Sequence, residues 1–538
     1  MKILLGPLLY AAESTAGEWR FRVNLLLDGV APHENVPLMV ESEDQDVEIS
    51  GPTLAWDFSE VRPDCTLWSW AFKAGRSAEE RRIKYRIRES SEGGRTLKEV
   101  DSVAVPARGE LPRFAFVSCN GVTEEKQFHQ VADFTAMWSR LLESHRQVLT
   151  HGRDEDQRSG FHVLIGGGDQ IYADSLWSKE PLFSIGRMKV EDRCAPLNGS
   201  KLKRLQLELR KQYLELYIKR WGSGLVADVL ARIPGVFTWD DHDIFDGWGS
   251  HDERLQSSPR YQAIFSAAAE SFDAFQVGGM TQGGNLKPND PGRETRAHRM
   301  QSVRFHGSDR ELEVLLLDLR SEREKHQVLS KAQWSDLSDW LATHAAGKEQ
   351  PNRHLVVVSS IPLVYMRFRA ERINAPFGLE DDRVDQWEHG NHRGERARLI
   401  MRLLQHAAEA NAQITILSGD VHVGSRGQVR STLPEHRLPG SSSTVIHQVT
   451  SSGIGHPPPT WLQWKAMELV SSEKRDRIAD RVVAEILPVT ASHRYLRTRN
   501  FLSGTFDSVS SGGRSVRLWL QWNTEEWGPI SEQVVVET

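Results

Sequence analysis

The chain has 538 residues, of which 39% are hydrophobic and 26% are charged, and its formal net charge is −6. This composition fits a globular protein that is too long for one small core, so we expect two or three structural units. The acidic balance without a basic block makes long nucleic acid a poor default partner, so none is expected. No segment has the roughly 18 uninterrupted apolar residues of a membrane helix.

Three cysteines are too few for a disulfide framework, which favours a reducing compartment. The start, MKILLGPLLYAAES, has one lysine before an apolar run, as a short signal peptide does. Gly6-Pro7 interrupts that run, and the alternating segment EWRFRVNLLLDG follows at once. We therefore expect an edge strand here rather than a signal, and a cytoplasmic protein, while export stays open.

Residues 1–112 show short alternating runs, such as TLWSWAFKA and RRIKYRIRES, between Gly, Pro, Asp and Ser. They predict a small antiparallel β domain in front of a second domain at residues 113–538. In the second domain, apolar runs that end in polar residues alternate with helical stretches, which predicts a layered α/β fold. These runs are RFAFVSC, FHVLIGGGDQ, IPGVFTWDD, ELEVLLLDLR, RHLVVVSSIPLV and AQITILSGDVH.

Helices are predicted in KLKRLQLELRKQYLELYIKRW, in LSKAQWSDLSDWL and in GERARLIMRLLQHAAEA. The second of these carries a capping-box pattern, with Ser330 followed three residues later by Gln333. Near the end of the chain, RTRNFLSGTFDS and SVRLWLQWN are joined by a Gly-Gly turn. They predict a hairpin that extends a sheet edge.

Metal-ligating side chains follow four of the predicted strands, at the ends where ligand sites of layered α/β folds gather. They are Cys119 and Asn120 in FVSCNG, Asp169, Tyr172 and Asp174 in LIGGGDQIYAD, Asp240 to Asp243 in WDDHD, and Asp420 and His422 in LSGDVHVG. Each group alone is more simply a core residue, a turn or a half-buried aromatic. Together they satisfy what a dinuclear metal site needs, several ligands from separate strands.

The ordered set SCNG, GDQIYAD, DDHDI and GDVH resembles the alkaline phosphatase D (PhoD-like) branch of the calcineurin-like metallophosphatases. The resemblance covers roughly residues 113–455, and the preceding β domain also fits that family's layout. Relative to the wider superfamily pattern, cysteine stands for the first ligand pair, Tyr172 ends the second motif, Asp241 replaces an asparagine and Asp420 replaces a histidine. The resemblance implies an αββα sandwich and a hydrolase of phosphate esters.

The resemblance also implies roles for the site residues. Asp169 would bridge two metals, and Cys119 and Tyr172 would join it on one of them, where thiolate and phenolate suit Fe³⁺. Asp241, Asp420 and His422 would lie nearer a second, hard cation such as Ca²⁺, although other divalent metals are possible and the contacts of Asp241 and His422 stay open.

Three further residues have implied roles in the reaction rather than in binding metal. His242 would contact the phosphoryl oxygens or protonate the leaving group, and Asp243 would orient its ring. Asn120 would hold a phosphate oxygen.

The expected activity is attack on phosphorus by a hydroxide that bridges the metals, on small phosphomonoesters, phosphodiesters or both. The alternatives are a phospholipase-like phosphodiesterase and a non-catalytic metal-binding scaffold. Arg320, in LLLDLRSER, is expected to bind substrate, and a structural ion pair is equally compatible with its place. Gly390-Asn391-His392 repeats a superfamily tripeptide but precedes a helix, so we interpret it as a loop. His447 and His456, near QVTSSGIGH, could line the pocket, but we favour core or loop histidines.

Overall fold

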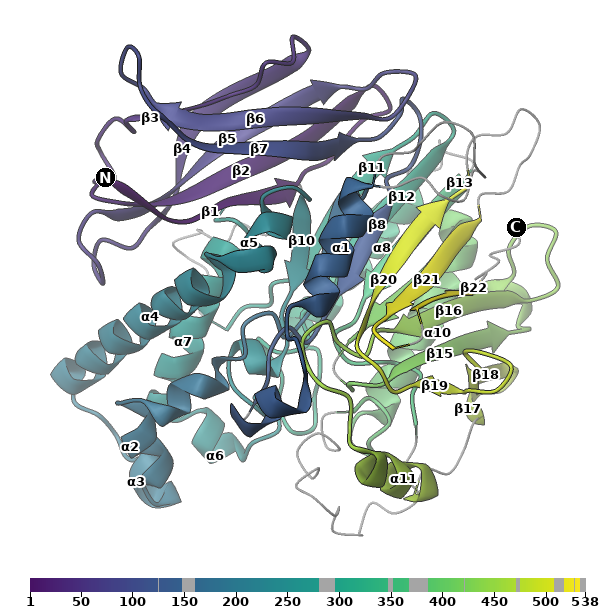
Figure 1. Ribbon diagram of the computed structural model, residues 1–538. Coiled ribbons are helices and arrows are strands. Elements are labelled where there is room, and N and C mark those ends of the chain that lie inside the picture. Colours follow the sequence, from purple (N-terminus) through teal and green to yellow (C-terminus); the bar gives the residue numbers. More distant parts are fainter. Residues whose placement is uncertain are drawn as a thin grey trace.

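The computed structural model describes residues 1–123, 125–147, 160–279, 296–346, 352–366, 386–419, 421–470, 475–507, 517–526 and 528–532. Two large β-sheets are stacked, with helices on their outer faces, and a smaller sheet lies over the N-terminal strands (Figure 1). The residues of the predicted site lie at the ends of strands in both large sheets.

In the described residues, the first sheet has ten strands in the order β22-β21-β20-β8-β9-β10-β1-β2-β5-β4. The central strands β8, β9 and β10 are parallel, so their carboxyl ends meet at one edge of the sheet. The bounds are β1 (Lys2–Ala11), β2 (Glu18–Asp28), β4 (Val47–Asp57), β5 (Cys65–Gly75), β8 (Phe114–Val117), β9 (Val163–Gly167), β10 (Gly235–Thr238), β20 (Asn500–Phe506), β21 (Leu518–Thr524) and β22 (Gly528–Glu532).

The second sheet runs β11-β12-β13-β14-β16-β15-β18-β17, and β19 pairs with β15 beside this path. Strands β12, β13, β14 and β16 are parallel. The bounds are β11 (Gln301–His306), β12 (Arg310–Leu316), β13 (Asn352–Val358), β14 (Ala412–Ser418), β15 (Gly424–Ser431), β16 (Thr444–Thr450), β17 (Arg475–Ala479), β18 (Val482–Leu487) and β19 (Tyr495–Leu496).

Alternation along the strands divides the interior into three cores. Phe114 and Phe116 of β8 face a core between the two sheets, whereas Ala115 and Val117 face the helices on the other side. Helices α1 (Ala136–Arg146), α4 (Gly199–Trp221), α5 (Gly224–Leu230) and α7 (Pro259–Phe275) cover the first sheet, and α8 (Lys331–Ala346) and α10 (Arg393–Ala410) cover the second. This confirms the predicted layered α/β fold with helices outside two sheets.

The N-terminal strands lie at the top of the molecule in Figure 1. Strands β1, β2, β4 and β5 belong to the first sheet, and β3 (Leu38–Glu41), β6 (Arg81–Glu89) and β7 (Thr96–Val105) form the third sheet. The segment predicted as an edge strand is β1, and it is not at an edge, because it pairs with β2 on one side and with β10 on the other, where Tyr10 faces Gly235. The first sheet therefore runs without a break across the proposed boundary at residue 112, which stays a prediction.

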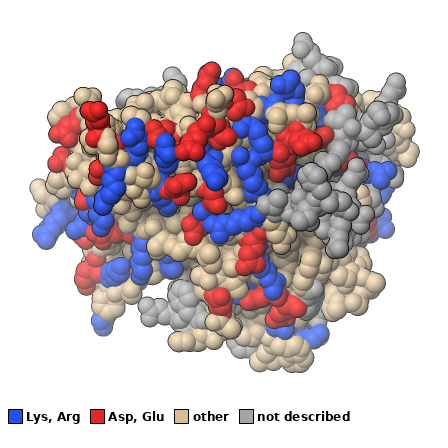
Figure 2. Space-filling view, turned by 45° about the horizontal axis from the view of Figure 1, so that its top comes forward, with Lys and Arg blue, Asp and Glu red and all other residues tan. Residues whose placement is uncertain are grey.

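The surface of the third sheet carries both signs of charge. Figure 2 shows Lys and Arg side chains interleaved with Asp and Glu over the face that it presents. On β6, Arg86 pairs with Glu43 at 2.8 Å and Arg81 pairs with Asp46 at 2.7 Å. Among the described residues, no helix is long and apolar enough to cross a membrane.

The shorter elements complete the chain and confirm several local predictions. The predicted C-terminal hairpin is β20 and β21, and β20 adds to β8, whereas its Gly-Gly turn lies outside the described residues. Ser330 caps α8 by accepting from the Gln333 amide at 3.0 Å, but the Gln333 side chain makes no return bond, so only half of the predicted capping box forms. The remaining elements are α2 (Leu182–Arg187), α3 (Val190–Cys194), α6 (Glu253–Gln256), α11 (Trp461–Val470), η1 (Glu125–Gln130), η3 (Ala173–Ser178), η4 (Asp241–Asp243) and η5 (Pro434–His436).

Candidate metal centre

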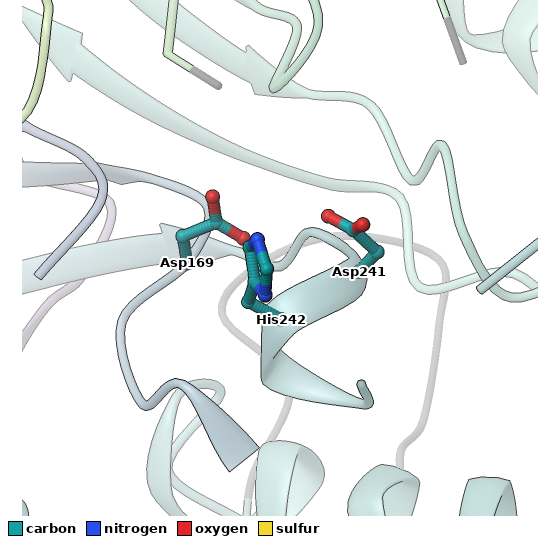
Figure 3. Close-up of side chains that lie close together, drawn as sticks. All are labelled: Asp169, Asp241 and His242. Atoms are coloured by element: carbon teal, nitrogen blue, oxygen red, sulfur yellow. The ribbon is translucent and has the colours of Figure 1, made fainter. Parts of the chain in front are cut away.

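The carboxyl ends of β8, β9 and β10 bring three of the four predicted ligand groups together. The Cys119 thiol lies 3.6 Å from Oδ2 of Asp169, although β8 and β9 are separated by a long stretch of chain. Asp169, Asp241 and His242 are all buried, and their ligand atoms lie within 4.8 Å of one another. Figure 3 shows these three side chains converging, Asp169 from the loop after β9 and the other two from η4.

The fourth group follows β14 in the second sheet. His422 is described, and its Nδ1 is buried without a hydrogen-bond partner. Asp420 lies outside the described residues, so its place as a ligand stays a prediction. The next strand in the sheet, β16, leads into the loop that holds Ser452 and His456. The Ser452 backbone bonds the His422 ring, and the His456 ring stacks on it.

The backbone at the predicted ligands is strained. Eight non-glycine residues of the described chain have a positive φ, and four of them are predicted ligands: Cys119 (50°), Asp169 (58°), Tyr172 (53°) and His422 (52°). A left-handed conformation costs a non-glycine residue on the order of 1–3 kcal/mol and persists where the surrounding structure over-determines it, most often at functional sites. The chain therefore accepts strain at four positions whose shared property is the predicted metal contact.

Two glycines make this crowding possible. A Cβ atom on Gly121 would lie 2.3 Å from the Tyr172 ring. Only glycine at this position therefore lets the turn after β8 come so close to the ring. Gly168 has φ +101°, and a Cβ there would lie 2.8 Å from Cβ of Asp240. Both glycines let backbone from one strand end pack directly against the next.

Asp243, the last acid of the DDHD stretch, bonds mainly to backbone amides. Asp243 accepts hydrogen bonds from the amides of Asp169, Gln170, Ile171 and Asp240 and from the side chain of Gln276, at 2.9–3.1 Å. These bonds consume both of its oxygens and fix the turn that carries Asp169. The expectation that Asp243 orients the His242 ring was therefore wrong, because its carboxylate is committed to this turn.

Arg320 is fully buried beside Asp240 and Asp241. Its Nε bonds Oδ1 of Asp240, its Nη1 donates to the carbonyl of Trp248 at 2.9 Å, and its Nη2 lies 3.2 Å from Oδ1 of Asp241. The structure thus shows the ion-pair alternative for Arg320, whose side chain has no exposed surface through which to bind a substrate. The single guanidinium charge offsets one of the two carboxylate charges of Asp240 and Asp241. The remaining carboxylate and that of Asp169 require a further cation or a proton.

Asp174 holds His242. Its Oδ2 lies 2.8 Å from Nδ1 of the ring, and its Oδ1 accepts from the Asp246 amide at 2.9 Å. Because a carboxylate only accepts, Nδ1 carries the hydrogen and Nε2 is left for the site. The motif GDQIYAD contains Asp174, but its spacing did not reveal this partnership, which depends on how η3 and η4 meet.

Charge and burial perturb the titration of these groups. Burial raises the pKa of Asp169 well above its ordinary value; His242 opposes this, and Asp240, Asp241 and Asp243 add to it. Burial lowers the pKa of His242, but the carboxylates of Asp174, Asp241 and Asp169 outweigh it, and the pKa is raised. An ionised acidic cluster here is stable only with positive charge among its oxygens.

Several buried polar atoms of the site have no hydrogen-bond partner: Oδ1 of Asp169, the Tyr172 hydroxyl and Nδ1 of His422. Leaving such atoms buried and unpaired costs about 1–3 kcal/mol each. The three atoms are a carboxylate oxygen, a phenolic oxygen and an imidazole nitrogen. All three kinds of atom bind metals in proteins, so the residues present fit a metal centre.

Asn120 is less free than the sequence suggested. Its Oδ1 accepts from Nε1 of Trp138 at 2.8 Å, and its Nδ2 donates to the carbonyl of Gln170 at 3.3 Å. The predicted contact with a phosphate oxygen stays a prediction. Gly390-Asn391-His392 lies in a loop as expected, with His392 directly before α10.

The sequence of residues 110–376 matches the family model for PhoD related phosphatase. This segment belongs to the PhoD-related phosphatases. The resemblance predicted from SCNG, GDQIYAD and DDHDI is thereby confirmed, and the match supports a phosphatase-type hydrolase that uses metal. The fourth motif, GDVH, follows β14 beyond the matched residues.

Other comparisons found more distant similarities. It is 24% identical to the uncharacterized protein YGR266W of Saccharomyces cerevisiae, over 85% of this chain and 73% of that protein. The structure of PhoD gives a TM-score of 0.49 at 13% identity, covering 99% of this chain and 92% of PhoD. Purple acid phosphatase PPD1 from yellow lupin (Lupinus luteus) gives 0.44 at 11% identity, covering 98% and 74%. These structural scores add nothing to the assignment, which rests on the family match and the site.

Proposed function

We propose that the protein is a metal-dependent hydrolase of phosphate esters that acts where β8, β9, β10 and β14 end. The observation that carries this proposal is the coincidence of three independent features at the same residues. Four of the six predicted ligands, Cys119, Asp169, Tyr172 and His422, have left-handed backbones, and three of these four carry buried atoms without a partner. A site that only stabilised the fold would have no reason to combine these costs.

Cys119, Asp169 and Tyr172 would hold Fe³⁺, with Asp169 shared, and Asp241, Asp420 and His422 would hold Ca²⁺ or another divalent metal. The distance of 3.6 Å between the Cys119 sulfur and Asp169 supports the first grouping. When bound, the metals would supply Lewis-acid charge and an activated water for in-line attack on phosphorus.

The chain's own residues would position the ester and move one proton. His242, tied at Nδ1 to Asp174, presents Nε2 beside Asp169 and Asp241, where a proton on Nε2 can pass to the departing alcohol oxygen. Tyr172 stacks on the His242 ring at 4.4 Å and restricts its rotation. Asp243 keeps the Asp169 turn in place through its amide contacts and does not take part in proton transfer.

The test is a metal analysis and an assay on one preparation purified without chelator. We expect bound iron with a second metal, a visible charge-transfer band from phenolate or thiolate to Fe³⁺, and hydrolysis of nitrophenyl phosphate. Comparison with bis(nitrophenyl) phosphate separates a monoesterase from a phosphodiesterase, including one with phospholipase-like specificity. Protein that binds metal but hydrolyses neither ester would favour the scaffold alternative. Active protein that is colourless and free of iron would refute the ferric assignment alone.

A further inference from the structure

The ring of His456 lies in a column of four aromatic rings at the proposed centre. His242 stacks on Tyr172 with 4.4 Å between ring centroids, Tyr172 on His456 with 5.8 Å, and His456 on His422 with 3.5 Å. The angles between successive ring planes are 15°, 22° and 10°. The other three rings belong to residues with proposed roles at the metals, so His456 shares their surroundings.

The backbone fixes His456 against a proposed ligand. Its amide donates to the carbonyl of Cys119 at 2.9 Å, and the Gly455 amide donates to the same oxygen at 3.2 Å. Gly453 has φ +121°, and a Cβ there would lie 3.0 Å from Cβ of Cys119. The loop after β16 therefore packs directly on the Cys119 turn and delivers His456 to the site.

The hydrogen bonds of the ring leave one nitrogen for the centre. Nδ1 of His456 lies 2.7 Å from the carbonyl of Pro457, and a carbonyl only accepts, so Nδ1 carries the hydrogen and Nε2 keeps its lone pair. His422 is arranged alike, with one hydrogen bond from its ring to the Ser452 backbone and Nδ1 without a partner. Histidines that bind metals commonly donate their other ring N–H to a carbonyl or carboxylate in this way.

The close approach of the two imidazoles distinguishes His456 from an ordinary core histidine. Aromatic pairs prefer centroid separations of about 4.5–7 Å in offset or edge-on arrangements, whereas His422 and His456 are nearly parallel at 3.5 Å. The side chain is also almost fully buried, with 6% exposed. The stacking places the two imidazoles side by side at the proposed centre, where each can present one ring nitrogen.

We propose that His456 is a further ligand of the metal centre, and that its Nε2 provides a nitrogen in addition to that of His422. This inference rests on the proposed metal-dependent function. It adds a nitrogen donor to a set that otherwise consists mostly of oxygen and sulfur atoms, which shifts the preference of the centre toward metals that accept imidazole.

The test compares His456→Phe with His447→Phe and the wild type. Phe at 456 keeps a stacking ring but removes the nitrogen, and His447 is a matched control because it is a buried histidine in the middle of β16 that is outside the ring column. We measure metal content per chain and the chelator concentration that removes half of the metal. His456→Phe should lose metal at a chelator concentration at least tenfold lower than His447→Phe and wild type, a change of the size that altered metal shells produce.

His456→Ala extends the test if the phenylalanine variant does not fold. Free imidazole should enter the space and restore metal retention, whereas it should not change retention in His447→Ala. Equal metal content and chelator resistance in wild type and His456→Phe, or no response of His456→Ala to imidazole, would overturn the assignment of His456. Wild-type protein that binds no metal would instead overturn the proposed function itself.

Discussion

Two buried clusters of acids and histidine in this molecule look alike by distance and differ in chemistry. Asp169, Asp241 and His242 lie at the strand ends, and Glu311, Glu313 and His344 lie between β12 and α8; in each group the ligand atoms are within 4.8 Å of one another. Proximity and burial alone would assign metal to both.

The surroundings separate the two clusters. Arg304 lies 3.1 Å from Glu313, Arg353 lies 3.2 Å from Glu311, and His344 bonds Glu313 at 3.1 Å, so the second cluster contains its own cations. The carboxylate oxygens of Glu311 and Glu313 are not among the buried atoms without partners, whereas Oδ1 of Asp169 is. Residues 310–316 are regular strand without a positive φ. Unbalanced charge, unpaired atoms and strained backbone therefore mark a metal site better than clustering does.

The largest expected effect concerns Asp169. Asp169→Asn should abolish hydrolysis and lower metal content while the fold persists, because the amide removes the charge shared by both proposed ligand sets. Metal analysis, activity and far-UV circular dichroism on one sample provide the measurement. Near-wild-type turnover would show that the Asp169 cluster is not the catalytic metal site, and the proposed distinction between the two clusters would fail.

His242→Ala tests the same cluster by separating metal binding from proton transfer. We expect retained metal and a loss in kcat of about a hundredfold, the size expected for a missing general acid. Metal analysis and steady-state kinetics measure both quantities. If His242→Ala loses as much metal as Asp169→Asn, then His242 is a ligand instead.

Asp174→Asn should have a smaller effect, of roughly tenfold on kcat, because the ring of His242 remains but its tautomer and orientation are less well fixed. Its readout is the pH profile, where the limb that reports His242 should move toward lower pH, since the nearest carboxylate that raises the pKa of that ring is gone. Asp246→Asn is a suitable control, because the Asp246 group that donates to Asp174 is the backbone amide, which this substitution keeps. An unchanged profile would show that Asp174 has no influence on the proton at His242.

The sequence predicted the parts of the molecule that depend on local pattern. Apolar runs located the parallel strands, and residue types after them located Cys119, Asp169 and Tyr172, because strand ends in such sheets converge. What it could not predict depends on distant partners. Arg320 pairs with Asp240 across the two sheets, and Asp243 bonds the turn of Asp169 instead of His242.

The same limit explains the other differences. Strand β1 lies inside the sheet because β10, far along the chain, pairs with it, and no feature of MKILLGPLLY indicates that partner. Glu311 and Glu313 were placed in a strand, but the cluster they form with His344 arises only when α8 packs on that strand. The ring column that contains His456 forms only when the loop after β16 packs on the Cys119 turn, so the sequence alone does not separate this residue from a core or loop histidine.

Glu313→Gln tests the second cluster. It should leave metal content and activity within about twofold of wild type, but lower the free energy of unfolding by on the order of 3 kcal/mol, since it removes the buried carboxylate nearest to His344 and Arg304. Chemical denaturation and metal analysis provide the measurement. Loss of stoichiometric metal without loss of stability would show that the second cluster is also a metal site.

The smallest expected effect is the acid sensitivity that Glu311 contributes. Burial raises the pKa of this carboxyl, but His306, Arg304 and Arg353 outweigh it and lower the value from 4.5 to about 2. A carboxyl with a lowered pKa in the folded state contributes stability that is fully present above its unfolded pKa and is lost as pH falls toward the folded pKa. The wild type should therefore lose more unfolding free energy between pH 6 and about pH 3.5 than Glu311→Gln, which lacks this group. Activity at neutral pH should be the same in both. Parallel stability curves over this range would mean that Glu311 is not held by its cations, and the charge balance that distinguishes the second cluster from the metal centre would have to come from elsewhere.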